Sequence, residues 1–186
     1  MKSPESANPP SSEFKNPPEV IIREAAPDDT EGIRRMQAKS WRETYPSPEN
    51  GVSREWVEEK TTGWFEPEGL AKSRGIWGQA ISDPAQFFRV AEMEGRIVGM
   101  IHGVIQEDVS GHLWGLYTDK SQHGTGLSSR FMDGLIEFFR QNNVRKVDLE
   151  VASYNGRAIR FYEKHGFAKV PDSEHHFAEI MPVINM

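Results

Sequence analysis

Hydrophobic and polar side chains follow two different periods along this chain. Val147-Asp-Leu-Glu-Val-Ala152 alternates apolar and polar positions with the period of two that is typical of a half-buried strand. After Leu127, apolar residues recur every three or four positions, with charged residues largely between them, which predicts an amphipathic helix with one buried stripe. The members of that stripe are Phe131, Leu135, Ile136, Phe138 and Phe139.

An earlier helix is expected to begin at Asp28. Asp28 can cap it, and Glu31, three residues later, has the spacing to reach back to the cap. Ile33, Met36 and Trp41 are the expected residues of its buried side.

The remaining pattern predicts further strands and helices. Residues 157–165 have helical character, and residues 46–84 read as an irregular connection with short helices, because aromatic side chains lie there among prolines, glycines and charges. Glu94-Gly95 is the expected turn of a hairpin. The strands expected besides 147–152 are residues 20–24, 87–93, 96–105, 112–118, 166–170 and 177–183.

Composition narrows the class of protein. The chain has no cysteine, which excludes disulfides, thiolate metal sites and a cysteine nucleophile. Its 22 Lys and Arg against 28 Asp and Glu give a net charge of −6, which argues against general nucleic-acid binding. Residues 130–169 nevertheless hold eight basic against five acidic side chains. This basic region suits an anionic ligand, and the acidic remainder favours a cationic substrate.

Length and the first residues suggest one domain with a tail. Residues 1–18 are rich in Pro, Ser, Asn and Glu, lack the apolar core of a signal peptide, and are expected to be a disordered tail before a domain of residues 19–186. No run approaches the ~18 apolar residues of a membrane span, so no membrane partner is expected and the cytoplasm is the default location. The oligomeric state stays open, a homodimer included.

The run His123-Gly-Thr-Gly-Leu-Ser128 has the features of a phosphate-binding loop. Gly124 and Gly126 lack a Cβ, so the backbone around Thr125 can take positive φ and approach a ligand closely. Amides at the start of the following helix have no partner within it and favour an anion. A plain tight turn is the alternative, and the fingerprints of nucleoside triphosphatases and dinucleotide-binding proteins are absent.

A second motif lies downstream, Leu149-Glu-Val-Ala-Ser-Tyr-Asn155 followed by Ala158-Ile-Arg-Phe-Tyr162-Glu-Lys-His-Gly166-Phe167. The two motifs together resemble the GNAT acyltransferase superfamily, in its Arg/Gln-x-x-Gly-x-Gly/Ala signature and its Asn…Phe-Tyr-Glu-Lys-x-Gly-Phe segment. The second motif is most similar to the ribosomal-protein alanine acetyltransferase branch. His123 and Ser128 depart from the first signature, which bears on coenzyme A affinity more than on the fold.

The resemblance implies an α/β (α+β) domain: a mixed, largely antiparallel seven-stranded sheet flanked by helices. Its fourth and fifth strands should splay apart and leave a wedge for the pantetheine arm of acetyl-coenzyme A. The implied activity is transfer of acetyl from acetyl-coenzyme A to a primary amine, small molecule or peptide N-terminus, by direct attack in a ternary complex. The implied cofactor contacts are Leu116, Tyr117, Thr118, His123, Gly124, Thr125, Gly126, Leu127, Ser128, Ser129, Asn155 and Tyr162.

Chemistry adds an acid and a base. An amine must be neutral to attack a thioester, so a base has to take its proton, and Glu150, which matches the family's proposed base, is the candidate. His112, Glu107 and Asp108 are the alternatives. Tyr162, at the family's acid position, can protonate the departing thiolate. Backbone N–H groups near residues 116–118 should polarise the thioester carbonyl.

Two other interpretations concern a metal site and a rival function. Glu174-His175-His176 has no third ligand at metal spacing and is expected to be a polar turn entering a strand, so no metal is expected. The rival function is a non-catalytic acyl-coenzyme A sensor or interaction module on the same fold. The altered His123 and Ser128 allow that rival, whereas the presence of Tyr162 and Asn155 favours an enzyme.

Overall fold

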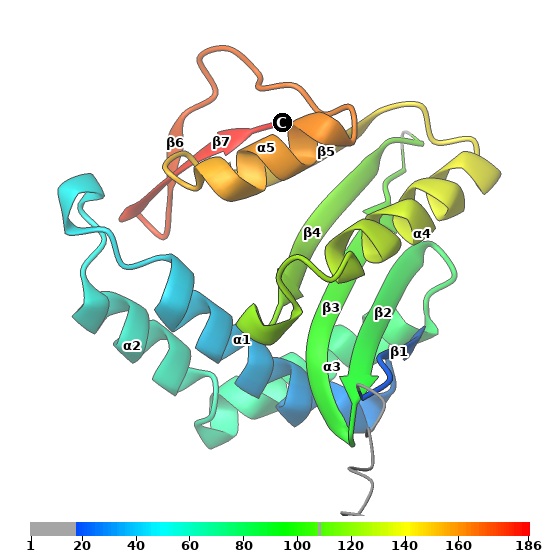
Figure 1. Cartoon of the computed structure of the whole chain (residues 1–186), viewed down its shortest axis with the longest axis horizontal. Helices are drawn as coiled ribbons and strands as arrows, with labels where there is room; N and C mark the ends of the chain where they lie inside the picture. Colours follow the sequence, from blue (N-terminus) through cyan, green and yellow to red (C-terminus); the bar gives the residue numbers. More distant parts are fainter. Residues whose placement is uncertain (1–17, 108) are drawn as a thin grey trace, which may run out of the picture.

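The computed structural model describes residues 18–107 and 109–186. The expected tail of residues 1–18 therefore lies, except for Pro18, outside the described residues, and so does Asp108. A single seven-stranded sheet runs through the molecule in the order β1-β2-β3-β4-β5-β7-β6 (Figure 1). Its strands are β1 (Ile21–Glu24), β2 (Gln86–Met93), β3 (Arg96–Ile105), β4 (Gly111–Thr118), β5 (Val147–Ala152), β6 (His175–Phe177) and β7 (Met181–Asn185).

Only the pair β4 and β5 is parallel, and every other neighbouring pair is antiparallel. The predicted mixed, largely antiparallel sheet of seven strands is thus confirmed. One predicted strand is wrong, because residues 166–170 form no strand. Gly166 takes a φ of 89° directly after the helix that precedes it, and Phe167 turns back against Tyr162 at 5.9 Å between ring centres. The single expected strand at 177–183 is instead the hairpin of β6 and β7.

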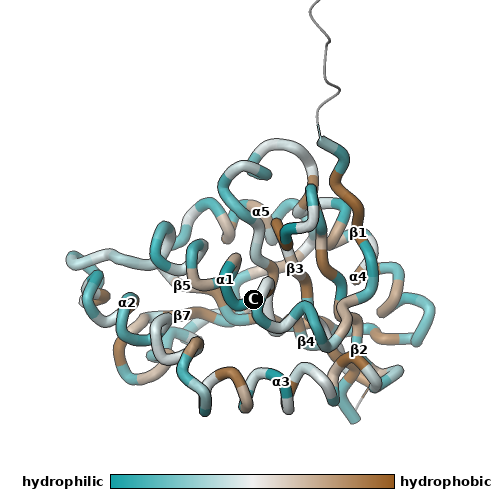
Figure 2. Tube along the Cα trace, turned by 90° about the horizontal axis from the view of Figure 1, so that it is seen from below, coloured by the Kyte–Doolittle hydropathy of each residue, from teal (hydrophilic) through white to brown (hydrophobic). Residues whose placement is uncertain are grey.

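Helices cover both faces of the sheet. They are α1 (Thr30–Thr44), α2 (Arg54–Gly63), α3 (Pro67–Ser82), α4 (Leu127–Gln141) and α5 (Gly156–Lys164). Buried side chains of α1 and α3 pack with Met100 of β3, whereas those of α4 and α5 pack with the neighbouring Ile101, whose side chain points to the opposite face. In Figure 2 the hydrophobic positions concentrate on the strands between these layers. No helix in the described part of the chain is long and apolar enough to cross a membrane.

The predicted buried faces are largely confirmed. Ile33, Met36 and Trp41 are buried, as are the stripe residues Phe131, Leu135 and Phe139, but Ile136 stays 40% exposed on the outer side of α4. The connection 46–84 contains α2 and the 16-residue α3, which is longer than the short helices expected there.

The predicted cap of α1 is wrong. Asp28 lies in a 3-10 turn before the helix, and α1 has no side-chain cap. The Asp29 carboxylate accepts a hydrogen bond from the Ala26 backbone N–H at 2.8 Å and pairs with Arg23. Asp29 therefore joins the end of β1 to the start of α1, a contact that depends on Arg23 from another element.

The sheet opens between its two central strands. β4 and β5 pair only from Gly111 to Leu113 against Val147 to Leu149, and beyond Leu113 they diverge (Figure 1). A register shift against β3 makes Trp114 the bulged residue at this point. The predicted splay of the fourth and fifth strands is confirmed, and it leaves the second half of β4 facing open space.

Candidate active site

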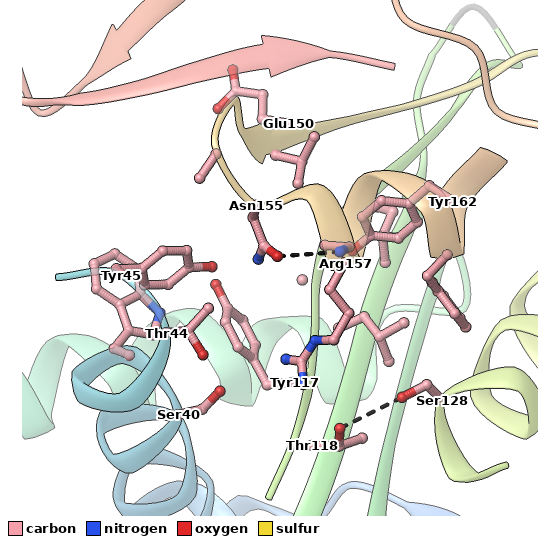
Figure 3. A pocket seen from close by; sticks show the side chains of 18 of the residues that line it. Ser40, Thr44, Tyr45, Tyr117, Thr118, Ser128, Glu150, Asn155, Arg157 and Tyr162 are labelled. Atoms are coloured by element: carbon pink, nitrogen blue, oxygen red, sulfur yellow. Dashed lines mark hydrogen bonds between the residues drawn. The ribbon is translucent and has the colours of Figure 1, made fainter. Parts of the chain in front are cut away.

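A cavity of about 500 Å³ occupies the opening between β4 and β5. Its walls come from the last turns of α1, the second half of β4, the loop before α4, the end of β5, the first turns of α5, and the hairpin of β6 and β7. In Figure 3 the side chains of Tyr45, Tyr117, Asn155 and Arg157 border one space, and Glu150 lies apart from them at one end. Most predicted site residues line it, as do Ser40, Trp41, Thr44 and Tyr45 of α1, which were not predicted as site residues.

The glycine loop forms one end of the cavity. Gly124 and Gly126 have φ angles of 81° and 86°, in the left-handed region where a Cβ would be strained, and Gly126 is the N-cap of α4. The Thr118 and Ser128 hydroxyls lie 3.5 Å apart and join β4 to the first turn of α4. Gly126, Ser128 and Ser129 line the cavity, so the start of α4, where N–H groups have no partner within the helix, borders the cavity and can bind an anion there.

Two loop residues lie outside the cavity wall. The Thr125 hydroxyl donates to the Gln122 carbonyl at 2.9 Å, and Leu127 is buried in the core beneath α4. These two side chains stabilise the loop from the side opposite the cavity. His123, Ser128 and Ser129, in contrast, line the cavity.

Arg157 is a site residue that the sequence analysis missed. It lies in the first turn of α5, lines the cavity, and places Nη1 2.7 Å from Nδ1 of His123. Burial and the neighbouring guanidinium lower the pKa of His123, which keeps its ring neutral at pH 7. The sequence signal that could have identified Arg157 is its place at a helix N-terminus. The macrodipole disfavours a positive charge there unless an anion is nearby.

All four tyrosines of the chain gather around this site. Tyr45, Tyr117 and Tyr162 line the cavity, and the Tyr154 hydroxyl donates to the Tyr45 backbone carbonyl at 2.8 Å. In Figure 3 the hydroxyls of Tyr45 and Tyr117 lie close together. Burial, and secondly Tyr117, raise the pKa of Tyr162, so its phenol stays protonated over the neutral range.

Asn155 sits where β5 ends and α5 begins. Its side-chain oxygen accepts a hydrogen bond from the Ala158 N–H at 3.1 Å and caps α5 (Figure 3). The oxygen is therefore occupied, and the side-chain NH₂ is the group that Asn155 can offer to a ligand in the cavity.

Glu150 lies at the end of the cavity away from the glycine loop. Its carboxylate accepts a hydrogen bond from Nε2 of His175 at 3.1 Å, and both side chains are partly exposed. The backbone carbonyl of Ser173, and secondly Glu150, raise the pKa of His175. The Ser173 carbonyl oxygen faces Nδ1 of His175 and the Glu150 carboxylate faces Nε2, and both oxygens favour the imidazolium form of His175. His175 and His176 lie in β6 rather than in the polar turn that was expected.

The alternative bases are placed differently. Nδ1 of His112 is hydrogen-bonded to the Asp148 carboxylate across the parallel pair, next to the base of the opening. Neither His112 nor Glu107 belongs to the described cavity wall. Asp108 lies outside the described residues.

The fold and the cavity together define an acyltransferase architecture. Within that class, the chain belongs to the GNAT acetyltransferase family, because the model of the Acetyltransferase (GNAT) family matches residues 31–167. The resemblance inferred from the two motifs is thus confirmed.

Curated relatives align with only part of this chain. Mycothiol acetyltransferase from Acidimicrobium ferrooxidans is 27% identical over 125 residues, which are 60% of this chain and 39% of that protein. An uncharacterized N-acetyltransferase of Mycobacterium tuberculosis is 32% identical over 103 residues, 55% of this chain and 65% of the relative. The chain therefore spans less than two thirds of the length of either relative.

Solved structures share the fold. The PaiA N-acetyltransferase of Thermoplasma acidophilum, in complex with coenzyme A, has a TM-score of 0.69 at 18% identity, over 90% of this chain and 98% of that one. The ribosomal-protein-S18-alanine N-acetyltransferase of Escherichia coli has a TM-score of 0.61 at 14% identity, over 90% and 91% of the two chains. At such identities the likeness shows the fold alone.

Proposed function

We propose that residues 19–186 form an N-acetyltransferase domain that moves acetyl from acetyl-coenzyme A to a primary amine by direct attack in a ternary complex. The observation that carries the proposal is the cavity between β4 and β5, with a glycine loop and a helix N-terminus at one end and a carboxylate at the other. Membership of the GNAT family and the coenzyme A complex of a protein with the same fold support it.

The glycine loop and Arg157 would hold the pyrophosphate of the cofactor. Backbone amides supply most of the contacts in such a loop, so the replacement of the family's Arg or Gln by His123 need not abolish binding. Arg157 supplies a cation beside the loop, because its Nη1 lies 2.7 Å from Nδ1 of that same histidine. The side-chain NH₂ of Asn155 would bind the pantetheine arm.

The open half of β4 would polarise the thioester carbonyl. The Asp119 N–H bonds the Val98 carbonyl of β3. Because successive N–H groups of a strand point to opposite sides, those of Leu116 and Thr118 point away from β3, into the opening. Unpaired strand amides of this kind can stabilise the oxyanion that forms when the carbonyl carbon is attacked.

The proposed chemistry needs one base and one acid. Glu150 takes a proton from the ammonium of the acceptor, directly or through water, and the neutral nitrogen forms a bond to the carbonyl carbon. The carbon–sulfur bond then breaks, Tyr162 protonates the departing thiolate, and the second proton that the nitrogen loses returns the phenolate to the phenol through water. The position of Tyr162 in the cavity wall supports this assignment, and its phenol is protonated at neutral pH, the state that an acid needs before the thiolate forms.

A thiol-release assay with acetyl-coenzyme A and a panel of primary amines tests the proposal. We expect amine-dependent release of coenzyme A and an acetylated product of the expected mass. The rival, a non-catalytic acyl-coenzyme A sensor, predicts thermal stabilisation by acetyl-coenzyme A with no amine-dependent release. That result would overturn the proposed transfer.

A further inference from the structure

Charge divides the cavity into two ends. Among its described lining residues, only Arg157 and Glu150 carry a full charge at neutral pH, because the pKa of His123 is lowered. Arg157 lies beside the glycine loop, the end that the proposed function gives to the phosphates of acetyl-coenzyme A. Glu150 is therefore the single full charge of the described wall that remains for the acceptor.

The surroundings of Glu150 provide no binding group for an anion. His175 directs one ring nitrogen to Glu150 at 3.1 Å and the other to the Ser173 carbonyl at 3.0 Å. Both nitrogens are thus engaged, and none is left to bind a substrate carboxylate. Oε1 of Glu150 accepts the bond from His175, and no hydrogen bond from a described residue to Oε2 is found. An ammonium group can donate to Oε2, whereas a substrate carboxylate would be repelled by Glu150 and would find no free N–H on His175, whose imidazolium is already bonded to Glu150 and to the Ser173 carbonyl.

An exposed aromatic side chain lies in the same cavity. Trp114, the bulged residue of β4, lines the wall although 63% of it is exposed. Its indole meets the ring of His112 edge to face at 4.4 Å, and Asp148 holds His112 by a hydrogen bond. Phe177 of β6 also lines the cavity and is 39% exposed. An exposed Trp ring in a cavity wall can bind cations as well as apolar chains.

The strand order places the charge between these rings. Trp114 lies on β4, Glu150 on the adjacent β5, and Phe177 on β6 beyond β7. We infer that the acceptor is a primary amine on an apolar or aromatic chain, with no carboxylate beside the amine, whose ammonium faces Glu150 and whose chain packs on Trp114. This inference rests on the proposed acetyl transfer and assigns Trp114 as a residue that determines acceptor specificity.

Four amines that differ in one group each test the inference. Phenethylamine carries the aromatic ring, phenylalanine adds a carboxylate, phenylalaninamide replaces that carboxylate by a neutral amide, and ethylamine removes the ring. We expect kcat/KM for phenethylamine and phenylalaninamide to exceed that for phenylalanine and for ethylamine by about tenfold or more, through charge repulsion and the lost ring contact respectively. Equal values for phenethylamine and phenylalanine would overturn the inference.

Variants of the indole give the second test. Trp114→Ala should raise KM for phenethylamine by about tenfold, with no change in the KM for acetyl-coenzyme A or in the KM for ethylamine, and Trp114→Phe should restore most of the loss. Ile76→Ala is the matched control, because Ile76 is 51% exposed on α3 and does not line the cavity. An unchanged KM for phenethylamine in Trp114→Ala would contradict the assignment.

A binding measurement separates this inference from the proposed function. Calorimetry of the four amines in the presence of coenzyme A reports their affinities without turnover. No turnover, together with tighter binding of phenethylamine than of phenylalanine, would overturn the transfer but support the acceptor site. Turnover without any discrimination among the amines would overturn only the acceptor site.

Discussion

Nη1 of Arg157 lies 2.7 Å from Nδ1 of His123, so the first turn of α5 meets the glycine loop that precedes α4. The loop itself has no basic side chain in the position where the family signature has Arg or Gln. In this chain the cation comes from a residue 34 positions later. The neutral ring of His123 accepts a hydrogen bond from the guanidinium of Arg157. This contact holds the positive charge of Arg157 beside the site proposed for the pyrophosphate.

Removing this cation should weaken cofactor binding. Arg157→Gln is expected to raise the Kd of acetyl-coenzyme A by about tenfold or more, because a charge-assisted contact to phosphate is lost. Isothermal titration measures the change. Arg160→Gln is the matched control, since Arg160 is an exposed cation of the same helix outside the cavity wall. Equal losses in both variants would indicate a general effect of helix charge rather than a contact.

Gly126→Glu should abolish the thermal stabilisation given by acetyl-coenzyme A. The new side chain adds bulk and negative charge at the N-cap of α4, where the proposed phosphate would lie. Gly95→Glu is the control, because Gly95 has a comparable φ of 72° in the turn between β2 and β3. Differential scanning fluorimetry with and without ligand compares the two. Retained stabilisation in Gly126→Glu would place the cofactor elsewhere.

Tyr162→Phe should lower kcat by ~10²-fold or more and leave the Kd of acetyl-coenzyme A unchanged, because a positioned acid contributes ~10²- to 10⁴-fold. Tyr154→Phe should keep kcat, because Tyr154 bonds the Tyr45 backbone carbonyl and does not itself line the cavity. Since burial raises the pKa of Tyr162, its ionisation should cause no fall in the wild-type rate up to about pH 10. A Tyr162→Phe enzyme with the wild-type kcat would remove the proposed acid.

Glu150→Gln should depress the rate most at low pH. The variant cannot remove the proton of the ammonium, but raising the pH toward the amine's own pKa supplies neutral amine without help. The rate should therefore recover partly as pH rises, which a pH–kcat/KM profile measures. The Tyr162→Phe enzyme should show no such recovery, since high pH provides no proton donor.

A wild-type profile in Glu150→Gln would exclude Glu150 as the base. His112 would then be the next candidate, because Asp148 orients its ring as a carboxylate orients a general base. His112→Gln should in that case show the loss at low pH. Glu107 and Asp108 would follow it in the same assay.

Local sequence determined most of the elements and the glycine loop. The period of two in residues 147–152 and the stripe of Phe131, Leu135 and Phe139 gave the correct strand and helix, because burial of one face imposes that spacing. Gly124 and Gly126 marked the loop because few other residues adopt its positive φ. The order and spacing of the two motifs were enough to identify the family.

The tertiary structure alone decided which side chains share the cavity. Contacts between distant segments leave no period in the sequence, so Arg157 beside His123, Trp114 on its bulge and the α1 residues could not be read from it. Contacts between neighbouring elements explain the errors. Phe167 packs against Tyr162 instead of continuing a strand, and Asp29 bonds Arg23 while Asp28 caps nothing. In each case a contact with a neighbouring element outweighed the local preference, because packing and ion pairing stabilise more than propensity does.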